Sequence, residues 1–362
     1  MKKSYKVGLV GLRRGQGLVS TLASHPQVEI AALCDLKPEV VADLGKAYSV
    51  PDSRLYTDFD QFVQAPVDAV VIATPIEYHA PQSIAAMEAG KHVLCEQTVA
   101  YTVDECLAVI DAVKRTGKAY MMAENYTYFH YVRQWKELVA QGKLGQIYYA
   151  EGEYIHAINH LLTDPKTGEK YWRYTRAPIW YCAHCLGPLL TLMDDRVVRA
   201  TGAHSNHHTH PGESIAYLDM EVGLFHTEKG AVVKILRSQI APRHPAMVYY
   251  SLYGTKGFVE NGRGDVRQNR GFRWLEGERT VEEGAEEIEC TIVDPNAPEE
   301  ARAGGHGTSE FFMVRDFIEA LDEGRQPPID VIRAVDFTIP GILAHEAAMR
   351  GGVWLEVPEY GW

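Results

Sequence analysis

An acid and a phenol lie on either side of one predicted helix. Glu124 follows a short apolar run, and Tyr154 lies in a run over 146–156 whose alternate residues share one parity, as in a half-buried β-strand. Apolar residues at helical spacing over 131–141 lie between them. Both groups can exchange protons in catalysis, although a tyrosine base needs its ordinary pKa of about 10 to be lowered. Without further support, Tyr154 would more often be a core residue, and Glu124 could simply cap the next helix.

A glycine-rich turn follows the first predicted strand, over 5–10, and precedes a helical pattern. Glycine lets the backbone approach a pyrophosphate, and the N-terminus of the helix attracts its charge. An arginine replaces the second glycine of the usual GxGxxG spacing, so the turn alone could also be an ordinary tight β–α turn. The candidate cofactor-binding residues in this turn are Gly11, Leu12, Arg13, Arg14 and Gly15.

The second predicted strand, over 28–33, ends at an acid, Asp35. An acid at this distance from the turn is typical of a carboxylate that binds the ribose hydroxyls of a dinucleotide. It would repel a 2′-phosphate, which favours NAD over NADP. Arg13 and Arg14 could instead attract that phosphate.

Two further buried strands are predicted over 68–73 and 92–95. Repeated β–α units require a parallel sheet, and ligands bind at the carboxyl ends of its strands. Residues 1–123 are therefore predicted to form an NAD-binding Rossmann domain. The candidates for cofactor binding that follow these two strands are Thr74, Pro75, His79, Glu96 and Gln97.

After this point the pattern changes. Alternating strands are predicted over 216–225, 231–239 and 248–253, and amphipathic helices over 309–323 and 332–349. Residues 124–362 are predicted to form a second α/β domain, with a large, open, mostly antiparallel sheet packed on helices, for substrate binding and oligomerisation. The last helix could pack back on the Rossmann domain.

Composition excludes several classes of protein. The net charge of −12 argues against nucleic-acid binding, which needs a basic face. No apolar run reaches the roughly 20 residues that span a bilayer, and glycines break the apolar start of the chain, which argues against a signal peptide. The six cysteines are scattered through a large chain, which predicts reduced thiols and a cytoplasmic protein.

Several short motifs, in order along the chain, resemble one known family. VGLVG, then IATP with a histidine after it, then AAMEAGKHVLCEQ resemble the Gfo/Idh/MocA oxidoreductases. Most dehydrogenases of that family carry Glu-Lys-Pro where this chain has Glu96-Gln97-Thr98, and the lysine assists proton transfer from the substrate hydroxyl. Gln97 cannot do so, because an amide neither carries a charge nor titrates. The Asp-x-Gly-x-His signature of the family is also altered, in the region around His184.

With both departures from the dehydrogenase pattern, the chain resembles one branch of the family. MMAEN, GEYIH, YWR, HCLGP and GHG together resemble its NAD-dependent glycosidases, typified by bacterial α-N-acetylgalactosaminidase. The resemblance implies that tightly held NAD+ oxidises the hydroxyl at sugar carbon 3, which acidifies the proton at carbon 2. A base then removes that proton, the aglycone leaves from carbon 1, water adds and the hydride returns.

The resemblance also implies roles for individual residues. Tyr154 matches the position of the base, and His184 matches a group that binds the carbon 3 oxygen or moves protons. Glu124 matches an orienting group or an acid for the leaving oxygen. The residues implied in substrate binding are Trp172 as a stacking face, Arg173 as a clamp, His156 and His306.

One cysteine pair and one group of histidines could be taken for metal or redox sites. Cys182 and Cys185 have the spacing of a redox or zinc pair, but no second pair follows, and no thioredoxin-like unit surrounds them. Histidines recur over 204–210, where alternating ones could line a strand and hold a metal, although a polar loop is the simpler interpretation. We therefore expect no metal site.

Other functions stay open. One is an NAD-dependent sugar or cyclitol dehydrogenase with net turnover of cofactor, in which Tyr154 or His184 would be the base. The other is a non-catalytic dinucleotide-binding regulator. The expected partner is a small glycoside or sugar, whose identity and anomeric form the sequence does not give. Arg173 and Arg176 would suit an acidic or sulfonated sugar, but neutral sugars also bind arginine. The open sheet, as in the family, predicts a homodimer or homotetramer.

Overall fold

The computed structural model describes residues 3–210, 218–264 and 269–362. The chain forms two compact units, and neither is one continuous segment. The first unit runs to Tyr128 and also takes in Val293–Val335 and Tyr360–Trp362; the second consists of Phe129–Ile292 and Asp336–Glu359. The chain thus leaves the first unit, builds most of the second and returns.

A parallel sheet forms the centre of the first unit. In the described part of the chain it has six strands in the order β3-β2-β1-β4-β5-β6, and all neighbours are parallel. The order reverses at β1, which is where a Rossmann fold binds its dinucleotide. The predicted Rossmann domain is confirmed. Its strands are β1 (Tyr5–Val10), β2 (Val28–Cys34), β3 (Leu55–Tyr56), β4 (Ala69–Ile72), β5 (His92–Glu96) and β6 (Tyr120–Ala123).

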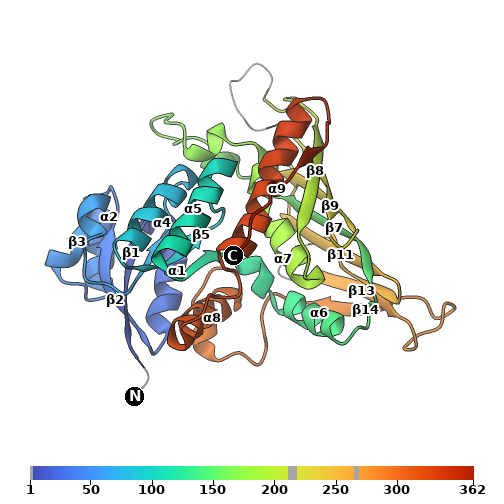
Figure 1. The fold of residues 1–362 in the computed structure, drawn as a ribbon, viewed down its shortest axis with the longest axis horizontal. Helices are drawn as coiled ribbons and strands as arrows, with labels where there is room; N and C mark the ends of the chain where they lie inside the picture. Colours follow the sequence, from blue (N-terminus) through green and yellow to red (C-terminus); the bar gives the residue numbers. More distant parts are fainter. Residues whose placement is uncertain (1–2, 211–217, 265–268) are drawn as a thin grey trace. The chain divides into compact units, whose positions relative to one another are not determined.

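Helices connect these strands (Figure 1). One of them, α5, begins with a capping box in which the Thr102 hydroxyl accepts from the Glu105 amide and the Glu105 carboxylate accepts from the Thr102 amide. The α-helices of this unit are α1 (Leu12–Ser24), α2 (Pro38–Ala47), α3 (Phe59–Phe62), α4 (His79–Glu88), α5 (Val103–Thr116) and α8 (Ser309–Glu323). Its 3-10 helices are η1 (Asp52–Arg54), η2 (Ile76–Tyr78), η3 (Asn125–Tyr128) and η7 (Glu299–Arg302).

Helix α8 belongs to the first unit although it is distant from the strands in sequence. Its Asp322 accepts hydrogen bonds from Tyr5 Oη (2.9 Å) and Gln27 Nε2 (2.7 Å), at the starts of β1 and β2. Just beyond it, the Ile329 carbonyl accepts from the amide of Met122 in β6 (3.1 Å). The late segment therefore contacts the starts of β1 and β2 and also the edge strand β6.

A second, larger sheet dominates the second unit. Over the described residues its nine strands lie in the order β14-β13-β12-β11-β7-β10-β9-β8-β15, and only β7 and β10 run parallel. The expected large, mostly antiparallel sheet is confirmed; the start of the strand predicted over 216–225 lies outside the described residues. The strands are β7 (Ile147–Ile155), β8 (Val197–His204), β9 (Glu221–Thr227), β10 (Val232–Ser238), β11 (Met247–Gly254), β12 (Gly257–Asn261), β13 (Asn269–Leu275), β14 (Glu286–Cys290) and β15 (Leu355–Glu356).

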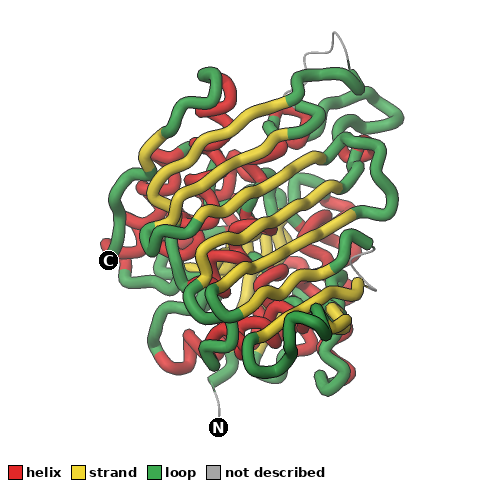
Figure 2. The backbone as a smooth tube through the Cα atoms, turned by 90° about the vertical axis from the view of Figure 1, so that its right-hand side faces the viewer, coloured by secondary structure: helices red, strands yellow, loops and turns green. Residues whose placement is uncertain are grey.

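Helices pack closely on one face of this sheet. A Cβ added at Gly152 in β7 would lie 3.1 Å from Cβ of Cys185 in α7, so glycine allows that close approach. Figure 2 looks onto the other face, which no helix of the described residues covers. The helices of this unit are α6 (His130–Ala140), α7 (Ala183–Met193), most of α9 (Val331–Met349), and the 3-10 helices η4 (Asn159–Leu161), η5 (Trp172–Thr175) and η6 (Pro178–Tyr181).

Candidate active site

The glycine turn of the first unit has the geometry of a phosphate cradle. Gly11 has φ +86°, and α1 begins directly after it, at Leu12. A Cβ at Gly11 would lie 2.5 Å from the Ala73 carbonyl carbon and 2.6 Å from the Thr74 nitrogen, both backbone atoms. Only glycine fits, and the positive end of the α1 dipole favours an anion at this point.

Asp35 joins the ends of β1 and β2. Its Oδ2 accepts from the Leu12 amide (2.8 Å) and its Oδ1 accepts from the Lys37 amide (3.0 Å). Each carboxylate oxygen can accept a second bond, so both retain capacity for ribose hydroxyls. The residues present fit NAD.

The two arginines of the turn differ in their surroundings. Both are exposed, but Arg14 Nε lies 3.3 Å from Glu96 Oε1 at the end of β5. Part of the Arg14 charge is thus balanced by a carboxylate, which weakens the case for a 2′-phosphate. Gly15 is buried one turn into α1.

His79 lies inside the fold. Its Nδ1 is 2.6 Å from the Thr98 carbonyl oxygen and its Nε2 is 2.8 Å from the Thr74 carbonyl oxygen, so the ring joins the segments that follow β4 and β5. The side chain is buried, as is that of Gln97. The position of His79 suits support of these segments, including Pro75, better than direct contact with a cofactor.

Glu124 is completely buried at the end of β6. Its Oε1 accepts from the Tyr126 amide (3.1 Å), and its carbonyl accepts from the Thr127 hydroxyl (2.7 Å). The carboxylate therefore does cap the following 3-10 helix, η3.

His306 lies in the same unit and is anchored by α8. Its Nδ1 is 2.5 Å from Glu310 Oε1, which also accepts from Asn125 Nδ2 (3.2 Å), next to Glu124. Burial raises the pKa of Glu310, but the hydrogen bond and charge of His306 outweigh it and hold that pKa below its ordinary value of 4.5. The structure thus joins the predicted residues Glu124 and His306 through Glu310.

This cluster makes a prediction about stability. Glu310→Gln should lower the free energy of unfolding at neutral pH by about 2 kcal/mol, because an amide cannot replace both acceptor oxygens in a buried site. The folded-state pKa is lowered, so the carboxylate stabilises the fold above the unfolded-state pKa, and this contribution is lost as pH falls through the folded-state pKa. Chemical denaturation from neutral pH downward should show the difference from the parent protein shrinking.

The control is on the same helix. Glu319→Gln removes a half-exposed carboxylate that lies 3.6 Å from Arg315, and it should leave stability unchanged because exposed pairs contribute little. A penalty for Glu310→Gln that stays constant into acid would contradict the expected role of the Glu310 charge.

In the second unit, Tyr154, His156 and His184 come together. Tyr154 Oη, in β7, lies 2.8 Å from Nδ1 of His156, the first residue after that strand. The His184 ring, in the first turn of α7, meets the Tyr154 ring edge-on at a centroid distance of 5.6 Å. Burial, followed by the charge of Arg237, lowers the pKa of His156. A neutral imidazole therefore faces the phenol at pH 7 and can accept its proton.

His184 is held through both its ring and its backbone carbonyl. Tyr181, at the end of η6, meets it edge-on at 5.5 Å, and Tyr250 Oη donates to the His184 carbonyl. The start of α7 is therefore held against β11.

Trp172 and Arg173 also contact each other. The guanidinium of Arg173 lies 4.3 Å over the Trp172 ring, so this side chain already covers one indole face. Arg176, which is buried, lies 5.6 Å from the same ring and 5.0 Å from the Tyr181 ring. The predicted stacking face and clamp thus form one aromatic–cation group with Tyr181.

Sequence reasoning missed Arg237 and Tyr181. Arg237 lies in β10 with its guanidinium 4.3 Å over the Tyr154 ring, and Tyr181 contacts both His184 and Trp172. A signal for Arg237 was present: it shares parity with Val233 and Ile235, which places a charge on the core-facing side of the strand.

Two family models together match nearly the whole chain. Residues 5–124 match the oxidoreductase family with an NAD-binding Rossmann fold, and residues 128–361 match the C-terminal domain of glycosyl hydrolase family 109. The chain belongs to glycosyl hydrolase family 109.

Curated relatives carry the same family name, and solved structures share the fold. A glycosyl hydrolase family 109 protein of Shewanella pealeana is 27% identical over 98% of this chain and 85% of its own length, and one of Streptomyces filamentosus is 28% identical over 99% and 78%. In fold the chain is similar to an oxidoreductase domain protein from Kribbella flavida (TM-score 0.83, 22% identity, 99% and 100% of the two chains). It is also similar to a levoglucosan dehydrogenase in complex with NADH and levoglucosan (TM-score 0.81, 20% identity, 99% and 100%).

The tempting cysteine and histidine clusters have ordinary structural positions in this family 109 chain. Cys182 and Cys185 are buried and form no disulfide, and burial raises the pKa of Cys182 to about 12, so Cys182 is not a reactive thiolate. Residues 205–210 follow the end of β8, and Asp219 accepts from the His208 and Thr209 amides there. Among the described residues, no group of three or more metal-binding side chains comes together.

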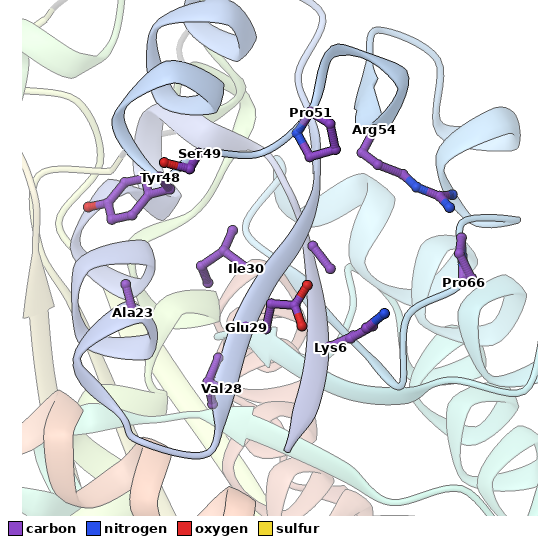
Figure 3. A pocket seen from close by; sticks show the side chains of 11 residues that line it. Lys6, Ala23, Val28, Glu29, Ile30, Tyr48, Ser49, Pro51, Arg54 and Pro66 are labelled. Carbon is purple, nitrogen blue, oxygen red and sulfur yellow. The ribbon is translucent and has the colours of Figure 1, made fainter.

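A cavity of about 640 Å³ lies in the first unit, away from the expected cofactor site. Lys6, Glu29 and Arg54 surround it (Figure 3), and its lining includes residues near the starts of β1 and β2. The residues predicted to bind the cofactor follow the carboxyl ends of the strands instead. No helix in the described ranges has both the length and the apolar character that a membrane crossing requires.

Proposed function

We propose that this protein is an NAD-dependent glycoside hydrolase that works by transient oxidation at sugar carbon 3, elimination of the aglycone, addition of water and re-reduction. The observation that carries this proposal is the 2.8 Å contact between Tyr154 Oη and His156 Nδ1, within the part of the chain that matches the glycosyl hydrolase 109 domain. A phenol against an imidazole has an acceptor for its proton, as abstraction of a proton from carbon requires.

The first unit would hold the cofactor. The pyrophosphate would meet the amides at the start of α1, where Gly11 leaves room, and Asp35 would accept from the ribose hydroxyls. The chemistry that bound NAD+ supplies is acceptance of a hydride from carbon 3 and its later return. Gln97, which stands where a lysine assists net dehydrogenation in the related oxidoreductases, has no proton to exchange.

The residues of the second unit would move the protons. A ketone at carbon 3 stabilises the carbanion formed at carbon 2, so Tyr154 as phenolate can take the carbon 2 proton. The resulting electron pair expels the aglycone from carbon 1, and Glu124 would orient or protonate its oxygen. His184 would bind the carbon 3 oxygen, take its hydroxyl proton during the oxidation and return it at the re-reduction, and His156 would exchange the phenol proton. Water then adds at carbon 1, Tyr154 returns a proton to carbon 2, and the hydride returns to carbon 3.

The substrate would be a small glycoside. Trp172, Arg173 and His306 are the further groups that we propose for sugar binding. The sugar itself, neutral or acidic, is to be found by assay.

The test is hydrolysis of a panel of neutral, N-acetylated and acidic nitrophenyl glycosides in heavy water, with and without added NAD+. We expect release of nitrophenol, deuterium at carbon 2 of the released sugar and no net NADH. Steady NADH formation from free sugars without nitrophenol release would instead identify a dehydrogenase. Binding of NAD+ with turnover of neither kind would identify a regulator.

We also propose that the protein is a cytoplasmic homodimer or homotetramer that associates through the helix-free face of the large sheet. An exposed aromatic side chain, Phe272 in β13, lies on this helix-free face according to the strand register and supports association, and the six buried cysteines, none of them in a disulfide, support a reducing compartment. Light scattering that gave the monomer mass of 40.5 kDa would contradict the oligomer.

A further inference from the structure

Arg237 is a charged residue in a position that strands normally give to apolar side chains. Along β10 it pairs in register with Tyr154 of β7 on one side and with Glu221 of β9 on the other. Its side chain is 0% exposed. Burial of a cation is costly unless other groups compensate it, so its surroundings should reveal its role.

Aromatic rings, and not carboxylates, surround the Arg237 guanidinium. Its Cζ lies 4.3 Å from the centroid of the Tyr154 ring and 5.5 Å from that of the Tyr181 ring. Nε donates to the Pro178 carbonyl at 3.4 Å, while Nη1 and Nη2 have no hydrogen-bond partner among the residues that the structure describes.

Glu221 is near but is engaged elsewhere. Its Oε2 accepts from the Ile179 amide at 2.9 Å, and its Oε1 lies 2.7 Å from His345 Nδ1. The carboxylate that pairs in register with Arg237 therefore directs its hydrogen bonds to η6 and α9. The charge of Arg237 is left to act on the rings.

We propose that Arg237 is a positioning residue for Tyr154, whose stacked guanidinium stabilises the phenolate over the neutral phenol. A cation over a neutral ring is attracted by the ring quadrupole, whereas over a phenolate it meets a full opposite charge, so the ionised form gains more. Only the use of that phenolate as a base rests on the proposed function; the effect on ionisation does not.

The other groups that face Tyr154 do not replace Arg237. His156, directly after the same strand, is neutral near pH 7 because burial and Arg237 lower its pKa. His184 and Tyr181 contribute ring edges from α7 and η6, and Arg176 adds a cation 5.0 Å from the Tyr181 ring, one ring further away. Glu221 is the carboxylate that opposes phenolate formation from β9. Arg237 is thus the permanent charge in direct contact with the phenol ring.

The test is Arg237→Met, a neutral side chain of similar length. Tyrosinate absorbance is titrated in the variant and in its Tyr154→Phe counterpart, and the difference isolates Tyr154. We expect the Tyr154 midpoint to rise by about one pH unit, a tenfold change in ionisation. The limb of the kcat/KM profile for nitrophenyl glycosides that rises with pH should shift equally, so that activity falls about tenfold at neutral pH and recovers in alkali.

Two controls distinguish charge from structure. Lys234→Met removes a positive charge from the opposite face of the same strand and should shift neither profile. Arg237→Lys retains a charge and should retain most of the parent ionisation. If Arg237→Met does not fold, Arg237→Gln removes the charge with a polar side chain.

An unchanged Tyr154 midpoint in a folded neutral variant would overturn the inference. So would a loss of activity by the same factor at every pH, which is the mark of a structural role. If no glycoside is hydrolysed, the proposed function fails, while the tyrosinate titration still decides the role of Arg237.

Discussion

Tyr154→Phe should lower kcat for nitrophenyl glycoside hydrolysis on the order of a thousandfold, because the phenylalanine ring fills the same space but carries no group that can take the carbon 2 proton. The substitution removes only the hydroxyl group, and the 2.8 Å contact of that hydroxyl with His156 Nδ1 is lost with it. Exchange of the carbon 2 proton with solvent deuterium should fall by a similar factor. Binding of NAD+ should be unchanged, because the cofactor residues belong to the first unit.

The control for this variant is Tyr148→Phe. Tyr148 lies on the same strand but is 53% exposed, so its hydroxyl should have no part in catalysis. Equal losses in the two variants would indicate a general effect on β7. Full activity of a folded Tyr154→Phe protein would show that another group is the base.

Gly11→Ala should abolish retention of NAD and destabilise the protein by about 3 kcal/mol. The left-handed conformation at φ +86° costs an alanine about 1–2 kcal/mol, and displacement of the backbone at Ala73 and Thr74 adds a similar amount. Displacement would also move the cradle at the start of α1 away from the position that suits a pyrophosphate. Thermal unfolding of the apoprotein and the NAD content after purification measure the two effects separately.

Gly117→Ala is the matched control in the same unit. Gly117 also has a positive φ, +65°, but a Cβ there would meet nothing within 4 Å. It should therefore cost only the conformational strain of about 1 kcal/mol and leave the NAD content unchanged. If both variants lose the cofactor equally, the close approach at Gly11 is not what matters.

Local sequence patterns predicted much of the fold. The alternation of buried strands and helices over the first hundred residues predicted a parallel sheet, because no short connection can join parallel strands. The amphipathic helix predicted over 309–323 coincides with α8, since its apolar period and its terminal Gly324 are local signals. Such signals need no knowledge of what the helix packs against.

Long-range partners could not be predicted in this way. Nothing in the spacing near Asp322 indicates that it accepts hydrogen bonds from Tyr5 and Gln27. The contacts of the candidate site also divide into those that local sequence predicts and those that it does not. Tyr154 near the end of β7 and His156 directly after it are two residues apart, so their proximity follows from β parity, whereas the contact of Tyr154 with Arg237 depends on a parallel pairing that joins distant segments.

The return of the chain to the first unit has a consequence for synthesis on the ribosome. The segment that supplies Asp322 and the Ile329 carbonyl is made only after nearly all of the second unit. At about 5–20 residues per second, the strands that end by Tyr128 would wait roughly 10–40 s for it. During that interval the first unit lacks the hydrogen bonds that the late segment makes to β1, β2 and β6. We therefore expect the first unit to complete its folding only when most of the second unit has also been made.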